Sequence, residues 1–380
     1  MSTSISSGLE ELGRAADARA SEIETLRRLP DDLAARLAAT GLCRALAPAE
    51  VGAAEAGVDE LVDAVEGLAF WDGAIAWCGM ISATTSLLAG HLPDDWVEPI
   101  FGAEDSVTGG YAAPVGTART VDGGLSVSGR WQWGSGTHHC TWIGGGTRVA
   151  TDGTPPRSDG MVAPFVFFAP DQVELLDTWH SAGLRGTGST DYVVEQALVP
   201  EGRWVQLGGP PNVDRPLYRF PFYGALAVGV ATVTLGLARR AISELVSLAA
   251  TKRPAQSSRT LAERSVVQAQ VAEAEAAQRS ARALLDETVR AAGEAAAAGE
   301  ISGEQRRLVR LATTNAALQA ARAVDLCYHA GGGSSVYESS PLQRVFRDVH
   351  VATQHAMVAP RTYEVLGRAA LGLPTDLSQI

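Results

Sequence analysis

Four side chains near the C-terminus are of types that can bind or react with a ligand. Arg344, Arg347 and Asp348 lie in one amphipathic stretch, and His355 follows it. Arginine suits the phosphate or carbonyl groups of a ligand. Histidine ionises near working pH, so His355 could orient a polar ligand or take a proton from it. No carboxylate follows Asp348 as far as Ala356, so this segment has no second carboxylate to act as a base.

A second group of candidate residues lies in the middle of the chain. Ser135, within the sequence Trp133-Gly134-Ser135-Gly136, could give a ligand a hydrogen bond without adding charge. His138 and His139 follow it. On a strand their side chains would point to opposite faces, so at most one is expected to face a site. The glycine-rich run from Gly183 to Ser189 has backbone N–H groups that could hold ligand oxygens.

Three compositional zones must position these residues. Residues 1–105 show helical periodicity, and residues 106–212 show short alternating runs with the hairpin signal Asp122-Gly123-Gly124. Residues 213–380 are rich in alanine and glutamate, with stretches long enough for bundle helices, the last expected from Pro341 to Leu371. Helical, β and helical zones without βαβ alternation predict an α+β fold and exclude a Rossmann or α/β-barrel architecture.

Composition excludes several classes of function. The net charge of -12 argues against nucleic acid as a partner, because binding phosphates needs clustered lysine and arginine. The four cysteines lie far apart, which fits a reduced protein and gives no sign of a metal site. The apolar run from Ala225 to Ala238 is too short and too mixed for a membrane span. The sequence therefore predicts a cytoplasmic protein that binds neither membranes nor metals.

The three zones and three motifs together resemble the acyl-CoA dehydrogenase fold. The residues from Trp133 to Gly136 stand where that family has its Trp-x-Thr/Ser flavin-contact motif, and Gly183 to Ser189 look like its second motif. Gly331-Gly332 and the segment from Pro341 to Asp348 resemble the third. The resemblance covers roughly the whole chain. It implies an N-terminal helical domain, a middle β-barrel or sandwich, and a C-terminal four-helix bundle around a flavin, either FAD or FMN.

A dehydrogenase of this family needs a glutamate base at one of two positions. By register these positions fall at Ala356 and near Leu226, and neither holds a carboxylate. The chain looks instead like the two-component flavin-dependent monooxygenases, in the branch of indole-acetate monooxygenases and aromatic hydroxylases. This resemblance implies that reduced flavin comes from a separate reductase and forms a flavin 4a-hydroperoxide with O2. The substrate would be a phenol, an indole or another heteroaromatic.

The resemblance also implies roles for individual residues and a homo-oligomer, either a dimer or a tetramer. The residues expected to take part in catalysis are His355, Ser135 and His138. Those expected to contact the flavin are Trp133, Ser135, Arg185, Gly186, Thr187, Ser189, Arg253, Gly332 and, through its guanidinium group, Arg344. Those expected to line the substrate pocket are Trp77, His91, His139, Phe222 and Ala356.

Other readings stay open on the sequence alone. An acyl-thioester dehydrogenase could use a base from another segment, and an amino-sugar N-oxygenase would share the oxygen chemistry. A non-catalytic scaffold of the same fold would bind no flavin. Purely structural roles are also open: Trp133 could belong to the β-domain core, Arg347 and Asp348 could pair with each other, and His355 could be satisfied at an interface.

Overall fold

The computed structural model describes residues 8–150 and 164–376, and the first part of this chain is helical. Its helices are α1 (Leu9–Ala18), α2 (Ala20–Leu26), α3 (Asp31–Ala39), α4 (Val58–Trp71), α5 (Gly73–Ser86) and α6 (Asp94–Phe101). Helix α5 is buried along its whole length. Asp72 caps its first turn by accepting hydrogen bonds from the backbone N–H groups of Ala74 and Ile75, at 2.9 and 3.0 Å. Helix α5 is therefore an interior element with a fixed starting point.

The middle zone forms a seven-stranded sheet with strand order β5-β6-β2-β1-β3-β4-β7. The strands are β1 (Thr108–Val121), β2 (Gly124–Gly134), β3 (Trp142–Val149), β4 (Pro164–Phe168), β5 (Glu174–Leu176), β6 (Thr190–Pro200) and β7 (Trp204–Gln206). Neighbouring strands are antiparallel, except that β1 and β3 run parallel. In the core, the rings of Trp131 and Tyr192 stack with centroids 5.3 Å apart. This stack fixes β2 against β6 and so positions Ser135, which directly follows β2.

The C-terminal part is a helical bundle. It consists of α7 (Phe222–Thr251), α8 (Ser265–Ala298), α9 (Gly303–Gly331) and α10 (Pro341–Ala352), followed by the short α11 (Thr362–Ala370). The expectation of one last helix from Pro341 to Leu371 is wrong, because residues 353–361 separate α10 from α11. Pro360 has no N–H and disfavours helical backbone at the residue before it. His355 therefore lies in an irregular segment and not on a helix.

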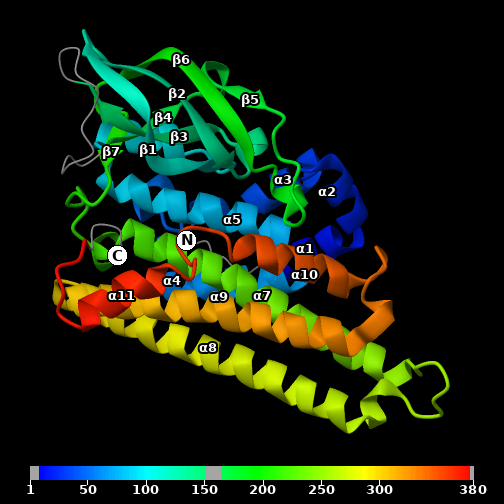
Figure 1. Cartoon of the computed structure of the whole chain (residues 1–380). Helices are drawn as coiled ribbons and strands as arrows, with labels where there is room; N and C mark the ends of the chain where they lie inside the picture. Colours follow the sequence, from blue (N-terminus) through cyan, green and yellow to red (C-terminus); the bar gives the residue numbers. More distant parts are fainter. Residues whose placement is uncertain (1–7, 151–163, 377–380) are drawn as a thin grey trace.

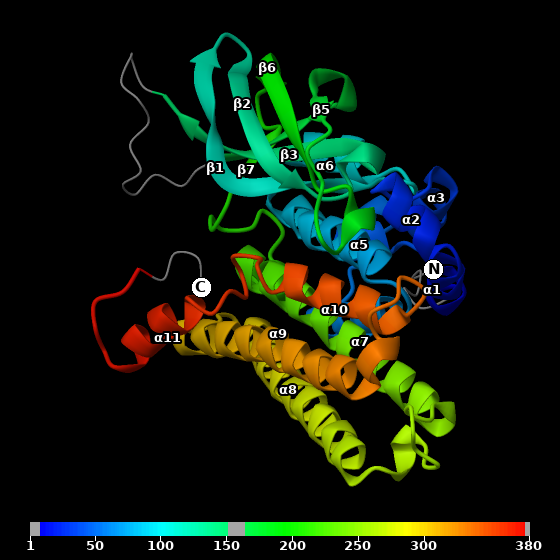
Figure 2. The same cartoon turned by 45° about the vertical axis from the view of Figure 1, so that its right-hand side comes forward.

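Helix α5 lies between the sheet and the bundle, with the strands on one side and α7 and α10 on the other (Figure 1; Figure 2). The predicted α+β class and the order of the three zones are confirmed. The segment Gly73–His91 and helix α7 are long and apolar enough to cross a membrane by length and composition alone. However, 100% and 89% of their apolar windows are buried inside the protein. In the described part of the chain they form the core on which the sheet and the outer helices pack.

Candidate active site

Trp77 contacts both Ser135 and His355, the two main candidates from the sequence. Its indole N–H donates to the Ser135 hydroxyl, with Nε1 and Oγ 3.0 Å apart. Its ring meets the His355 ring edge-on, with centroids 5.7 Å apart. Trp77 lies near the start of α5, Ser135 follows β2, and His355 lies between α10 and α11. Three distant parts of the chain therefore converge on one indole.

A chain of hydroxyl groups continues inward from Ser135. Ser135 Oγ lies 2.7 Å from Ser189 Oγ, and Ser189 Oγ lies 2.6 Å from Thr187 Oγ1. Thr187 Oγ1 donates to the backbone carbonyl of Leu184 at 2.8 Å. We refer to the Trp77 N–H, the three hydroxyls and the Leu184 carbonyl together as the hydroxyl relay. Its members lie in the buried interior, so water does not compete for these bonds.

The two ends of the hydroxyl relay determine the direction of every bond in it. The Leu184 carbonyl can only accept, so Thr187 donates its single hydroxyl hydrogen there, and Ser189 must then donate to Thr187. Because the Ser189 hydrogen is used in this way, Ser135 must donate to Ser189. The Trp77 N–H can only donate, and it takes one lone pair of Ser135. Ser135 therefore has an acceptor lone pair left for a ligand, whereas the sequence suggested a donor.

Leu184, at the inner end of the hydroxyl relay, is held by Asp348 of α10. The Leu184 N–H donates to Asp348 Oδ1 at 2.6 Å. Leu184 also has a left-handed φ of 48°, which residues other than glycine rarely adopt. Burial raises the pKa of Asp348 to about 7, although the Leu184 N–H and the Arg344 charge both act to lower it. The Asp348 carboxyl thus fixes the turn on which the relay ends.

The two arginines of α10 have structural partners. Arg347 and Asp348 bind different groups, so the alternative in which they pair with each other is wrong: Arg347 Nη1 donates to the Ala182 carbonyl at 2.6 Å. Arg344 is buried and pairs with Asp17 at 2.8 Å. The expectation that Arg344 faces a flavin phosphate is therefore also wrong, because its charge is already neutralised inside the protein.

His355 is half-buried, and the backbone orients its ring. Nδ1 accepts the N–H of Met357 at 3.3 Å, so the neutral ring carries its proton on Nε2. Burial, and then the nearby positive charge of Arg310, lower the pKa of His355 to about 4. A neutral ring with a proton on Nε2 is a hydrogen-bond donor and a weak base. The neighbouring Ala356 is exposed and supplies neither acid nor base.

An exposed aromatic side chain and a partnerless arginine atom accompany the hydroxyl relay. Trp133 is 54% exposed, with a left-handed φ of 57°, so it does not belong to the β-domain core. Its ring meets Tyr111 edge-on, with centroids 5.7 Å apart. Arg185, in the loop that carries the relay, has a buried Nε without a hydrogen-bond partner among the described residues. An aromatic face, a free guanidinium donor and the Ser135 lone pair suit a planar, anionic cofactor, so these residues fit a flavin.

The remaining residues expected to contact the flavin lie in two places. Gly186 belongs to the loop of the hydroxyl relay and packs on α2 so closely that an added Cβ would collide. Gly332, with a φ of 56°, follows α9, next to a carbonyl of Gly331 that accepts from Lys252 Nζ at 2.6 Å. Arg253 adjoins Lys252 and is exposed. The structure therefore brings Gly332 and Arg253 to one end of the bundle, separate from the relay.

The adjacent histidines His138 and His139 lie in the 3-10 helix η4 (Thr137–His139), so the expectation that they sit on a strand is wrong. A glycine with left-handed backbone precedes them and starts this turn. His138 is exposed and lies against Gly188 of the relay loop. His139 Nε2 donates to the Leu29 carbonyl at 3.0 Å. His139 thus fastens the N-terminal helices to the β domain.

His91 and Phe222 lie near the far end of α5 from Trp77. His91 ends the 3-10 helix η3 (Leu87–His91), which follows α5, and burial lowers its pKa. At 1.5 Å per residue it lies about 20 Å along the helix from Trp77. Phe222 packs on the apolar cluster that contains Leu88. His91 is therefore distant from Trp77 along α5, whereas the Phe222 ring meets that of Tyr223, with centroids 5.5 Å apart.

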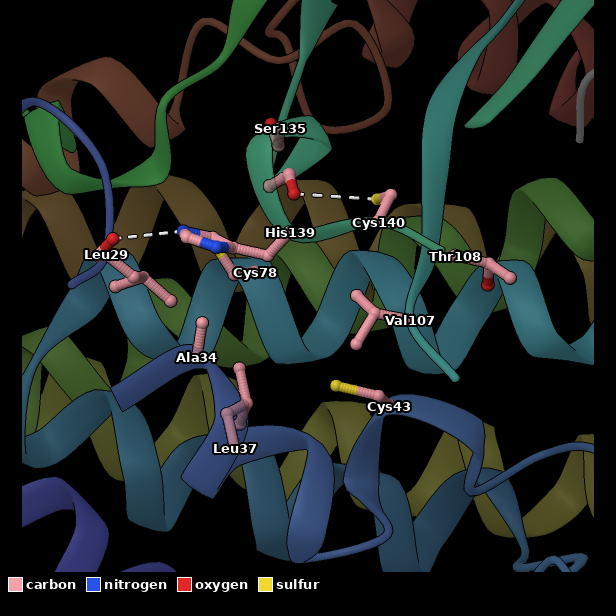
Figure 3. A pocket seen from close by; sticks show the side chains of 11 residues that line it. Leu29, Ala34, Leu37, Cys43, Cys78, Val107, Thr108, Ser135, His139 and Cys140 are labelled. Atoms are coloured by element: carbon pink, nitrogen blue, oxygen red, sulfur yellow. Dashed lines mark hydrogen bonds between the residues drawn. The ribbon is translucent and has the colours of Figure 1, made fainter. Parts of the chain in front are cut away.

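A small hollow with a cavity volume of about 10 Å³ borders Ser135 on the side of α3 and α5 (Figure 3). Its lining is apolar apart from a few hydroxyl, thiol and imidazole groups, and consists of Leu29, Ala34, Leu37, Cys43, Cys78, Val107, Thr108, Ser135, Gly136, His139 and Cys140. Burial raises the pKa of the Cys43 thiol to about 12 and also raises those of Cys78 and Cys140, so all three stay protonated. Among the described residues, no group of three or more His, Cys, Asp or Glu side chains could hold a metal ion. The hollow is thus a neutral space that disfavours water next to Ser135.

Two residues of the site were missed by sequence reasoning. Arg310 of α9 reaches the segment after α10, where its Nη1 lies 3.0 Å from Met357 Sδ. A signal was present, because Arg310 falls at helical spacing with Thr313 and Ala317 on the buried stripe of α9. No comparable signal exists for Leu184, because tertiary contacts hold its left-handed backbone. Helical periodicity that includes charged residues therefore indicates Arg310 but not Leu184.

Comparisons with known proteins agree with this geometry. The family described as "Acyl-CoA dehydrogenase, C-terminal domain" matches residues 228–360. Indole-3-acetate monooxygenase of Pseudomonas putida is 33% identical over 358 residues, which cover 93% of this chain and 90% of that protein. The flavin-dependent monooxygenase oxygenase subunit HsaA of Rhodococcus jostii is 30% identical over 371 residues, which cover 94% and 95%.

Two solved structures show the same fold over nearly the whole chain. The crystal structure of 3-HSA hydroxylase from Rhodococcus sp. RHA1 has a TM-score of 0.92 at 28% identity and covers 99% of both chains. XiaF from Streptomyces sp., in complex with FADH2 and glycerol, has a TM-score of 0.89 at 25% identity and covers 97% of this chain and 96% of its own. The likeness therefore extends over the N-terminal helices, the sheet and the bundle alike.

Proposed function

Since the chain belongs to the flavin-dependent monooxygenases that share the acyl-CoA dehydrogenase fold, we propose that it hydroxylates a small aromatic or heteroaromatic substrate. When bound, reduced flavin activates O2 and delivers one oxygen atom to the substrate. The substrate in the name of the Pseudomonas relative supports an aromatic ring. The observation that carries the proposal is the Trp77 indole, which contacts both Ser135 and His355.

The direction of the hydroxyl relay supports a preference for the reduced cofactor. Ser135 offers an acceptor lone pair, and flavin N5 carries a hydrogen only in the reduced form. If Ser135 lies against N5, it accepts a hydrogen bond from reduced flavin. In oxidised flavin it would face a second lone pair. The protein would then retain the form that a reductase delivers and release the form that remains after turnover.

His355 is proposed to orient the substrate by donating a hydrogen bond from Nε2. Its pKa of about 4 makes it a poor base for a phenol. The phenol pKa is about six units higher, so proton transfer to this ring would be uphill by roughly 8 kcal/mol. For His355 to act as the proton acceptor that the sequence suggested, the causes of its lowered pKa would have to change: first the burial of the ring, and then the positive charge of Arg310.

Further residues are proposed to hold the flavin or a partner. Trp133 could stack on the isoalloxazine, Arg185 could bind phosphate or carbonyl oxygens, and the backbone from Gly186 to Ser189 could donate further hydrogen bonds. The relative named as an oxygenase subunit indicates a separate flavin reductase as the partner. We further propose a homotetramer in the cytoplasm. The exposed Trp133 and Tyr337, 54% and 66% accessible in the single chain, support contacts with other subunits.

The test supplies flavin reduced by a reductase, 18O2 and a panel of phenols and indoles, and follows the products by mass spectrometry. We expect one 18O atom per product molecule. His355→Ala should lower the product yield and raise the release of H2O2, because flavin oxidation continues while the substrate is no longer oriented. Failure to incorporate 18O over the whole panel, or reduction of the flavin by an acyl-CoA without a reductase, would contradict the proposal.

A further inference from the structure

Arg310 is a buried arginine without a carboxylate partner in the described part of the chain. It is 3% exposed, and its Nη1 donates to Met357 Sδ at 3.0 Å and to the Tyr223 carbonyl at 3.4 Å. Its Nε is buried and has no hydrogen-bond partner among the described residues. A guanidinium has five N–H donors, and a thioether with one distant carbonyl satisfies them poorly.

The other buried arginines are better satisfied. Arg240 and Arg344 both pair with Asp17, at 2.9 and 2.8 Å. Arg44 donates to the backbone carbonyls of four residues. Arg203 lies over two indole rings and donates two hydrogen bonds. Burying a charge without such partners is strongly unfavourable. An anion bound to Arg310 would therefore offset the cost of burying its charge.

Arg310 lies beside the candidate active site. Met357, which it contacts, gives its N–H to His355 Nδ1 at 3.3 Å. The charge of Arg310 also reaches the His355 ring and lowers its pKa. Gly331 adjoins Gly332, one of the expected flavin contacts, and lies about 30 Å away along α9. The arginine is therefore placed to meet a ligand of the active site and not the far end of a dinucleotide.

Tyr223, whose backbone carbonyl Arg310 contacts, begins a series of neighbouring aromatic side chains. Burial together with the neighbouring Tyr111 raises the pKa of the Tyr223 hydroxyl. Tyr111 in turn meets Trp133, with ring centroids 5.7 Å apart. These rings, together with those of His355 and Trp77, give the region around the Arg310 contacts an aromatic character that suits a ligand with an aromatic body and a negative end.

We propose that Arg310 binds the carboxylate of an aromatic acid whose ring lies toward His355 and Trp77. The inference rests on the proposed function for its reaction, but it concerns binding and can be tested without turnover. A planar guanidinium can hold a carboxylate through two parallel hydrogen bonds. Its Nε is a suitable donor for one of them, because this atom has no partner among the described residues.

Binding of an acid at Arg310 should also change His355. The positive charge of Arg310 is the second cause, after burial, that keeps the His355 ring neutral. A carboxylate against the guanidinium would offset this charge, so the pKa of His355 should rise. A neutral analogue of the same shape should leave the pKa unchanged. His355 therefore reports on the charge of whatever occupies the Arg310 end of the site.

The experiment compares matched acids and amides: phenyl-, 4-hydroxyphenyl- and indole-3-acetate with their uncharged primary amides. Affinities are measured by anaerobic calorimetry on the full chain with reduced FAD. We expect at least one acid to bind about 30-fold more tightly than its amide. Arg310→Gln should weaken the binding of the acid and leave the binding of the amide unchanged. Arg306→Gln, which alters an exposed arginine one turn earlier in α9, should leave the preference intact.

A second measurement on the unaltered protein covers the case in which Arg310→Gln does not fold. NMR of 13C-labelled histidines, with the His355 signal assigned from its loss in His355→Gln, should show a raised pKa with the acid and not with the amide. The assignment of Arg310 is overturned if no acid binds more tightly than its amide, or if Arg310→Gln weakens both equally. Acid preference without any 18O-labelled product would instead overturn the proposed reaction and leave the assignment standing.

Discussion

Ser135 differs from an ordinary hydroxyl because its hydrogen and one lone pair are both engaged inside the protein. A free hydroxyl can turn to donate or to accept, whereas one that is held on both sides presents a single polarity to a ligand. The low polarity of the surroundings strengthens these bonds and opposes a reversal of the chain. The hydroxyl relay therefore converts an adaptable group into one that distinguishes donors from acceptors.

Ser189→Ala tests this polarity. Alanine removes the group that accepts the Ser135 hydrogen, so Ser135 becomes free to donate. The affinity for oxidised flavin should then rise about tenfold relative to that for reduced flavin, which corresponds to roughly one neutral hydrogen bond. Dissociation constants for both redox states, measured anaerobically, give this ratio.

Ser181→Ala is a matched control for this prediction. Its hydroxyl donates to the Gly183 carbonyl at 2.8 Å, in the same loop but outside the hydroxyl relay. The ratio of the two affinities should be the same as in the unaltered protein. If Ser189→Ala also leaves the ratio unchanged, the direction assigned to the relay is wrong.

At the scale of the elements, the site depends on short irregular segments that are held by buried side chains. The 3-10 helix η6 (Arg185–Thr187) carries Thr187 of the relay, and Asp348 of α10 holds the residue before it. The bundle therefore sets the geometry of a loop that belongs to the β domain. A change in the charge of Asp348 acts directly on this junction, since burial disfavours its ionised form.

Asp348→Asn should flatten the pH dependence of stability. Burial raises the pKa of Asp348 from 3.8 to about 7, so between these values the folded state keeps a proton that the unfolded state has lost. The free energy of unfolding should therefore fall by up to about 1.4 kcal/mol per pH unit as the pH rises through this window, and level off above it. Asparagine does not titrate and keeps an oxygen for the Leu184 N–H.

Urea unfolding of both proteins at pH 5, 6 and 7.5 measures this effect. His355 contributes with the opposite sign, because its lowered pKa makes stability rise between about pH 4 and 6.5. This contribution is common to both proteins and cancels in their difference. If the free energy of unfolding changes with pH in the same way for both proteins, Asp348 does not titrate as a buried acid.

Sequence patterns predicted the regular elements well and the irregular ones poorly. The hairpin at Asp122-Gly123-Gly124 is confirmed, since β1 and β2 pair directly across it. The periodicity of α10 suggested a helix that continues past His355, and alternating residues suggested a strand at His138. At His138 a glycine with left-handed backbone starts a turn, and Pro360 disfavours helical backbone just before α11; periodicity registers neither residue.

The candidate site was predicted only in part, for a similar reason. Motifs singled out Ser135 and His355, and the structure adds that Trp77 contacts them both. The acceptor polarity of Ser135 depends on Thr187 and Ser189 being within hydrogen-bonding distance, which spacing in the sequence does not determine. The lack of a carboxylate at Arg310 can be seen only when its neighbours in space are known.

At the scale of the whole molecule, the site lies where the sheet, α5 and the bundle meet, so its geometry depends on how closely the helical layers pack. Helix α7 approaches α4 at Gly236, where an added Cβ would lie 2.6 Å from both the Glu66 carbonyl oxygen and Ala69 Cβ. A backbone atom of a packed helix cannot give way alone. The absence of a side chain at Gly236 thus sets the spacing between two layers.

Gly236→Ala should therefore destabilise the protein, and Gly293→Ala should stabilise it. The first forces α4 and α7 apart and should cost about 1–3 kcal/mol of unfolding free energy. The second lies on an exposed part of α8, with nothing within 4 Å of a new Cβ, and should gain about 0.5–1 kcal/mol from helix propensity. Urea unfolding gives both values. A Gly236→Ala protein as stable as its parent would contradict the close packing.

The segment between α10 and α11 bears on how such an enzyme can diversify. It supplies His355 and Met357, while the hydroxyl relay comes from α5, the end of β2 and the loop around η6. An irregular segment tolerates substitutions, insertions and deletions better than the helices on either side of it. After a gene duplication, substitutions in this segment and at Arg310 can therefore change the substrate preference. The residues of the hydroxyl relay, which are proposed to contact the cofactor, can stay the same. One scaffold can in this way give rise to hydroxylases for acidic and for neutral rings.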